Sequence, residues 1–236
     1  MKNSNRTALL SPVFLGLGAV ALLLHRWLFT YVEDEVAWLL PAATVPEILL
    51  WVLMAAAAVA AFLFTRKTVV MPMGRVVPAV SSVLLAGGTA TLLLEEVTGP
   101  AALVLAYHWL CVLAAAALVA AAFLHGTGRK VPFLLELPVC LQFVAQLLIC
   151  YQLWSEVPQL MDYVLGLGAI LCLTMAGYFH LARSAGLPGK SWNNAVGLLG
   201  VFFCAAAVAQ GTFSWFFTTA AVWLAGIYAG LQPAEG

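Results

Sequence analysis

Residues 101–124 read AALVLAYHWLCVLAAAALVAAAFL and contain no Asp, Glu, Lys or Arg. A helix needs about 20 apolar residues to cross the hydrocarbon core of a bilayer, so this stretch predicts a membrane-spanning helix. The rest of the chain has the same character, since 64% of its 236 residues are hydrophobic, 8% are charged and the mean hydropathy is +1.02. Soluble domains carry about 25% charged residues. The composition therefore indicates an integral membrane protein.

Apolar stretches of similar length recur along the sequence and are joined by short connections. They predict an all-α, polytopic transmembrane bundle of about eight spans that forms one domain over residues 1–236. The predicted spans are 9–29, 46–64, 77–94, 101–124, 131–154, 161–182, 194–209 and 213–230. Only Gln210, Gly211 and Thr212 separate the last two segments. That pair is either a helical hairpin or one long bent element.

The charged residues predict the orientation of the bundle, because short cytoplasmic loops are enriched in Lys and Arg. A cytoplasmic N-terminus places nearly all basic residues on the cytoplasmic side, with Arg26 as the exception. The acidic residues then gather on the other side, and eight spans return the C-terminus to the cytoplasm. The basic residues of this pattern are Lys2, Arg6, Arg66, Lys67, Arg75, Arg129, Lys130, Arg183 and Lys190. We expect a bacterial inner membrane.

Composition also argues against several classes of function. The formal net charge is 0, so the chain has no basic stripe for nucleic acid. The five cysteines lie within apolar runs without metal-ligand spacing, and we interpret them as small buried hydrophobes. No nucleophile-elbow, zinc-protease or phosphate-loop motif is present. An enzyme is the least supported class, because few ionisable groups share one depth.

The fifth predicted span carries the most polar stripe of the chain. Glu136 lies near its cytoplasmic start, and Gln142 and Gln146 follow at i,i+4 spacing. Thr174 and Tyr178 add polar groups on the sixth span. Two interpretations remain open: hydrogen bonds between helices, which we favour, or a path for a solute or a proton.

Two histidines are expected at a similar depth near the outer face. His25 lies near the end of the first span, and His108 lies about 10 Å into the fourth span by helical rise. They are axial ligands of a b-type haem, a protonatable pair in a transport path, or two unrelated histidines, and we favour the last. Arg26 reads as an interfacial anchor beside Trp27, with an outward-facing anion site as the alternative.

Small and polar residues elsewhere have structural interpretations. Gly87 and Gly88 in the third span predict close helix packing. Asn193 and Asn194 are expected to cap the seventh span. His180 is expected at headgroup level without a special role.

Two main functional hypotheses follow from these features of the sequence. The first is a non-catalytic membrane component without a bound cofactor, whose partners are the lipid bilayer and other membrane proteins. The second is a small-solute transporter with a polar path along the fifth span. A haem-binding redox subunit is a third alternative.

Overall fold

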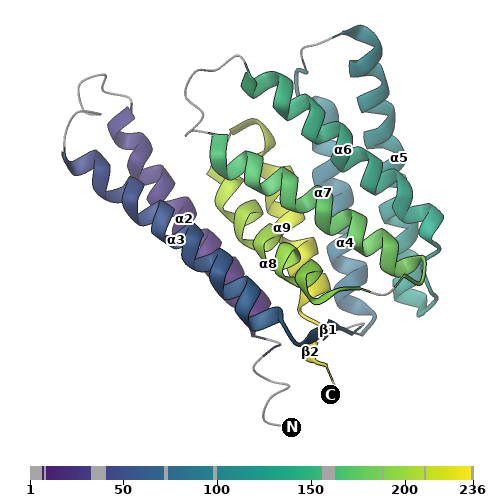
Figure 1. Ribbon diagram of the computed structural model, residues 1–236. Helices are drawn as coiled ribbons and strands as arrows, with labels where there is room; N and C mark the ends of the chain where they lie inside the picture. The colour runs from purple at the N-terminus through teal and green to yellow at the C-terminus, as the bar shows by residue number, and fades with distance from the viewer. Residues whose placement is uncertain are drawn as a thin grey trace.

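The computed structural model describes residues 7, 9–32, 41–71, 74–97, 100–155, 163–187, 189–209 and 211–234. Within these residues the chain forms eight α-helices and one small sheet (Figure 1). The helices are α2 (Leu10–Val32), α3 (Pro41–Thr65), α4 (Val76–Thr91), α5 (Ala101–Thr127), α6 (Phe133–Ser155), α7 (Val164–Ser184), α8 (Ser191–Ala206) and α9 (Ser214–Tyr228). The strands are β1 (Thr68–Val70) and β2 (Leu231–Pro233).

The predicted transmembrane helix bundle is confirmed. Seven of the described helices are long and apolar enough to cross a bilayer, and α9 is a shorter apolar helix of 15 residues. Most helix ends fall within a few residues of the predicted spans. The largest difference is at α3, which begins at Pro41 and includes Pro46, the residue expected to start it. Proline is tolerated inside membrane helices because neighbouring groups satisfy the carbonyl that it leaves free.

The last two segments form a helical hairpin, and α8 packs along α9. Two short 3-10 turns join them, Ala207–Ala209 and Gly211–Phe213. Gly211 has a φ of 42°, in the left-handed region that glycine adopts most readily. The turn therefore reverses the chain between two separate helices.

The small sheet ties the C-terminal segment to the connection after α3. β1 and β2 pair antiparallel, with Val69 opposite Gln232. The Asn194 side chain donates a hydrogen bond from Nδ2 to the backbone oxygen of Thr68, at 2.9 Å. Asn194 thus joins α8 to β1, and the N-cap of α8 is Lys190, without a side-chain cap. The capping role expected for Asn193 and Asn194 is wrong, because both lie inside α8.

Five of the described helices form a ring, and α2, α3 and α8 lie outside it. α4 packs on α5 and α9, α5 on α6, α6 on α7, and α7 touches α9. α8 packs on α7 and α9, and the α2–α3 hairpin packs on α8 at the side of the molecule (Figure 1). The centre of the ring is bordered by α4, α5, α6, α7 and α9.

Small residues bring these helices close together, as the sequence predicts for Gly88. A Cβ added to Gly88 would overlap the side chain of Thr219 on α9, whereas Gly87 faces open space. On α2, a Cβ at Gly18 would lie 2.5 Å from the backbone oxygen of Phe202 on α8. In lipid, such packing drives helix association, because lipid tails are as apolar as the helix surfaces.

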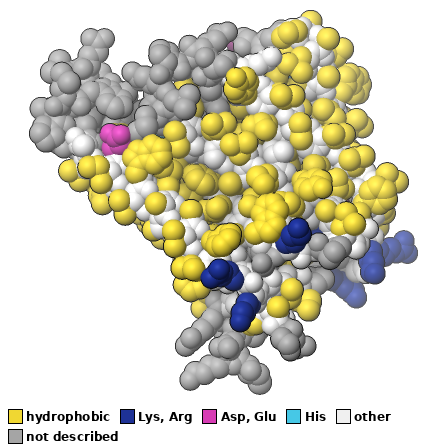
Figure 2. Space-filling view, viewed as in Figure 1, with side chains coloured by type: hydrophobic (Ala, Val, Ile, Leu, Met, Phe, Trp, Pro, Cys, Tyr) yellow, Lys and Arg dark blue, Asp and Glu magenta, His cyan; other side chains and the backbone are white. Residues whose placement is uncertain are grey.

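Charged residues occupy the two ends of the bundle, and apolar side chains cover the sides. Figure 2 shows hydrophobic side chains over the flank of the molecule, with Lys and Arg at its lower edge. We call the end that carries β1 and β2 the basic face, and its cations are Arg66, Lys67, Arg75, Arg129, Lys130, Arg183 and Lys190. Glu47, Glu95 and Glu96 lie at the opposite end. The other predicted outer carboxylates, Glu33, Asp34, Glu35, Glu156 and Asp162, are outside the described residues.

Pairing of β1 with β2 predicts that Val69→Cys and Gln232→Cys form a disulfide in a cysteine-free background. Side chains directly opposite in an antiparallel pair have Cβ atoms about 4.5–5.5 Å apart, within reach of a disulfide after small adjustments. Oxidation followed by proteolysis and non-reducing electrophoresis would reveal the cross-link. Val69→Cys combined with Glu96→Cys, at the opposite end, is the control that must stay uncross-linked. Failure of the first pair would contradict the eight-helix path.

Candidate functional site

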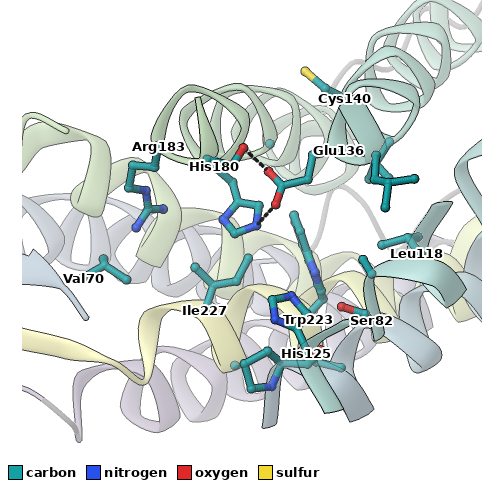
Figure 3. Close-up of a pocket in the computed structure, with 18 of the residues that line it drawn as sticks. Val70, Ser82, Leu118, His125, Glu136, Cys140, His180, Arg183, Trp223 and Ile227 are labelled. Atoms are coloured by element: carbon teal, nitrogen blue, oxygen red, sulfur yellow. Dashed lines mark hydrogen bonds and ion pairs between the residues drawn. The ribbon is translucent and has the colours of Figure 1, made fainter. Parts of the chain in front are cut away.

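A cavity of about 330 Å³ lies inside the ring of helices, at the end nearest the basic face (Figure 3). Its walls come from the last turns of α5, α7 and α9 and from the first turns of α4 and α6. The lining side chains that carry polar groups are Ser81, Ser82, His125, Glu136, His180, Arg183 and Ser184. The remaining wall is mostly apolar and includes Leu118, Val139, Cys140, Trp223 and Ile227.

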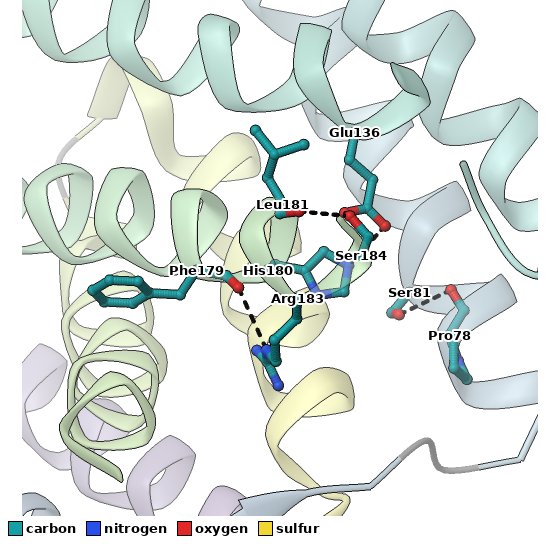
Figure 4. Close-up of polar contacts among 8 residues, drawn as sticks. All are labelled: Pro78, Ser81, Glu136, Phe179, His180, Leu181, Arg183 and Ser184. Atoms are coloured by element: carbon teal, nitrogen blue, oxygen red, sulfur yellow. Dashed lines mark hydrogen bonds and ion pairs between the residues drawn. The ribbon is translucent and has the colours of Figure 1, made fainter. Parts of the chain in front are cut away.

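Glu136 is the centre of the polar wall. Its Oε1 lies 3.2 Å from His180 Nε2, and its Oε2 accepts a hydrogen bond of 2.7 Å from Ser184 Oγ (Figure 4). Glu136 is in the first turn of α6, where a carboxylate is favoured by the helix dipole. The exposed fraction of its side chain is 12%, against 27% for His180. The pair is thus largely enclosed but still reachable from the basic face.

Ser184, Glu136 and His180 form one connected polar group. Ser184 donates to one carboxylate oxygen of Glu136, and the other oxygen faces His180. The arrangement fits recognition of a polar group on a bound molecule.

Arg183 supplies a positive charge one helical turn from His180. Its Nε donates to the backbone oxygen of Phe179 at 3.5 Å, and its guanidinium carbon lies 5.7 Å from the ring centre of Tyr228. Among the described residues Arg183 has no carboxylate partner, and its buried Nη2 has no hydrogen-bond acceptor. The cation is therefore packed in place and available to a bound group.

An aromatic cluster closes the cavity away from the basic face. The Trp223 ring meets His180 edge-on, with ring centres 5.6 Å apart, and Phe143 in the same way at 5.8 Å. Phe143 in turn lies 6.3 Å from Phe216. Gly177 makes room for it, since a Cβ there would lie 2.7 Å from the Phe143 ring. We call Phe143, Phe216 and Trp223 the aromatic plug.

Glu136 is the residue of the predicted polar stripe that lines this cavity. Gln142 and Gln146 are fully buried in the neighbourhood of α5, where Tyr107 donates to Gln146 Oε1 at 2.5 Å. Gln146 Nε2 donates to Cys150 Sγ at 3.3 Å, and Gln142 lies beside Cys111. Each residue turns a helix by about 100°, so Gln142 projects about 240° around α6 from Glu136. The polar stripe predicted along the fifth span is therefore divided between two faces of α6.

The two residues predicted on α7 also lie apart from the cavity. Thr174 is placed to donate to the backbone oxygen of Ile170 in its own helix, at 2.7 Å, and to that of Phe143 on α6, at 3.3 Å. Tyr178 is 57% exposed on the outside of the bundle, against Phe179. Neither is among the residues that line the cavity.

His25 and His108 belong to different parts of the bundle. His25 is buried on α2, which packs mainly on α3 and α8, whereas His108 is on α5, which packs mainly on α4 and α6. A bis-histidine haem needs imidazoles from facing helices, and these two helices do not form such a pair. In the described part of the chain, no cluster of three His, Cys, Asp or Glu residues is placed to hold a metal.

Arg26 lies on the exposed side of α2, next to a half-exposed Trp27. This position suits the predicted interfacial anchor. Three of its expected partners, Glu33, Asp34 and Glu35, lie outside the described residues.

Sequence reasoning did not single out His125 and gave His180, Arg183 and Ser184 no role. One signal was present: Cys140 follows Glu136 at i,i+4 spacing and lines the same cavity. The other residues come from the ends of α5 and α7, and only the packing of the ring brings them to Glu136. His125 then lies close enough to Glu136 and His180 for their charges to interact.

Comparisons of the chain with protein families, with curated proteins and with solved structures found no match. The cavity and its residues are therefore the basis for assigning a function.

The Tyr107–Gln146 bond predicts a measurable coupling between α5 and α6. Hydrogen bonds between membrane helices contribute about 0.6 kcal/mol on average and up to about 1.7 kcal/mol. Tyr107→Phe and Gln146→Leu should each lower the free energy of unfolding in detergent, and the double variant should lose less than the sum. If the two single losses in the free energy of unfolding simply add in the double variant, the hydrogen bond is contradicted. Thr174→Val with Tyr107→Phe is the control pair, since these residues share no contact and should be additive.

Proposed function

We propose that this protein is a non-catalytic integral membrane component that binds a small solute in the cavity at its basic face. The cavity carries this proposal. Ligand sites are typically concave and mainly apolar, with a few convergent polar groups. Here Glu136, His180 and Arg183 converge from α6 and α7 onto one wall, and Leu118, Val139 and Ile227 provide apolar surface.

Binding from one side is better supported than permeation. The aromatic plug lies between the cavity and the opposite end of the bundle. Gln142 and Gln146, which a path along α6 would need, are buried on another face of that helix. A transporter built on this site would have to move Phe143, Phe216 and Trp223 in each cycle.

The basic face is inferred to be the cytoplasmic side, because Lys and Arg concentrate in short cytoplasmic loops. Its cations flank three of the connections between helices, α3–α4, α5–α6 and α7–α8. On this inference the solute comes from the cytoplasm. The bacterial inner membrane remains a prediction from the sequence.

Cys140 gives a direct test of whether the cavity admits solutes. Of the five cysteines, it is the one that lines the cavity, whereas Cys204 is fully buried on α8. Two proteins, each retaining one of these cysteines, are treated with N-ethylmaleimide in nanodiscs. We expect the Cys140 protein to react at least about tenfold faster, because a thiol in a closed core reacts only when the protein opens locally.

Mass spectrometry of the intact protein measures both rates. Melting temperatures of the two proteins must agree, so that local opening is equally rare in each. Equal slow modification of Cys140 and Cys204 would contradict a solute-binding cavity.

A further inference from the structure

We infer that the bound solute is a small organic anion, with its carboxylate or phosphate held by Arg183 and its apolar part against the wall of the cavity. This inference rests on the proposed function, because it names the chemical class that the same cavity accepts. The anion would enter from the basic face, where α5, α6 and α7 present their ends to water.

The unpaired charge of Arg183 is the first argument. A guanidinium is always protonated and offers several donors in a planar fork that matches a carboxylate or phosphate. Its Nη2 is buried without an acceptor in the described part of the protein, and the ring of Tyr228 lies beside the guanidinium. A buried donor without an acceptor is costly. A bound anion would supply the missing acceptors.

The carboxylate on the same wall is already engaged. Glu136 accepts a hydrogen bond from Ser184 and faces His180. Its negative charge is therefore directed toward these two groups, both on α7. A bound cation would have to displace His180 to reach Glu136, whereas an anion at Arg183 leaves that pair intact.

The charges around the cavity predict how affinity for an anion changes with pH. His125 faces it from α5, Glu136 from α6, and His180 and Arg183 from α7. α4 contributes Pro78, Ser81 and Ser82, and α9 contributes Trp223, Gly226 and Ile227, none of them charged. With both histidines neutral, Arg183 and Glu136 cancel. Protonation of His125 makes the site positive, so an anion should bind more tightly as the pH falls.

Two thiol reagents of similar size and opposite charge test the inference on the protein that retains only Cys140. They are 2-sulfonatoethyl and 2-(trimethylammonio)ethyl methanethiosulfonate. Each rate is divided by the rate at Leu187→Cys, an exposed position near the basic face, measured in a cysteine-free background. At pH 6 the normalised rate of the anionic reagent should exceed that of the cationic reagent by about fivefold or more. This preference should shrink at pH 8.

Substitutions then assign the preference to Arg183. Arg183→Gln should abolish it, whereas Arg183→Lys keeps the charge and should retain most of it. Lys190→Gln removes an exposed cation that does not line the cavity and is the matched control. Unchanged gel filtration and melting temperature of each variant would show that the bundle is intact. Loss of the preference in Lys190→Gln would assign it to the general surface potential and overturn the inference.

Nanodiscs of two compositions distinguish the source of the anion. If a lipid headgroup occupies the cavity, phosphatidylglycerol should slow the normalised modification of Cys140 relative to phosphatidylcholine. If the ligand is a free anion, both lipids give the same rate, and millimolar hexanoate should protect Cys140. Either result supports an anion site.

The outcomes distinguish failure of the anion inference from failure of the proposed solute-binding function. Equal normalised rates for the two reagents would overturn the anion class while leaving an accessible cavity. If neither reagent modifies Cys140 while Leu187→Cys reacts fully, both the anion inference and the proposed solute-binding function are overturned.

Discussion

Polar groups within a membrane must find their partners inside the protein, because the hydrocarbon offers none. Several polar side chains of this bundle do so. Thr65 bonds to the backbone oxygen of Ala61 in its own helix, Ser11 reaches across to Ala225 on α9, and Tyr107 holds Gln146. Polar side chains that satisfy one another in this way fix which helices are neighbours. The wall around Glu136 and Arg183 differs, because its groups face a cavity.

The arrangement of the helices explains why that cavity exists. Close packing at glycines, such as Gly88 against Thr219, joins α4 to α9, and α5, α6 and α7 complete the ring. Farther from the basic face the large rings of Phe143, Phe216 and Trp223 fill the centre. Near the basic face the surrounding side chains leave a cavity of about 330 Å³. The centre of the ring is therefore filled by side chains at the level of the aromatic plug and open as a cavity near the basic face.

The spans were predictable because about 20 apolar residues are needed to cross a bilayer and short charged connections interrupt them. The basic residues likewise predicted that the C-terminal segment shares an end with the connection after α3. The site was predictable only in part, through Glu136. Helical periodicity places Glu136 and Gln146 on different faces of α6, although both are polar residues of the same span. His180 and Arg183 belong to α7. The sequence pattern of a single span does not predict that α7 packs beside α6.

On the proposed function the cavity reaches water at one face alone, and the most direct measurement compares access to Cys140 from the two sides of a sealed membrane. Vesicles of each orientation, with Cys140 as the sole cysteine, are treated with a membrane-impermeant thiol reagent. Modification should occur only from the side that carries Val69 and Gln232. Modification from the opposite side would show a path past Phe143 and Trp223 and would contradict the one-ended cavity.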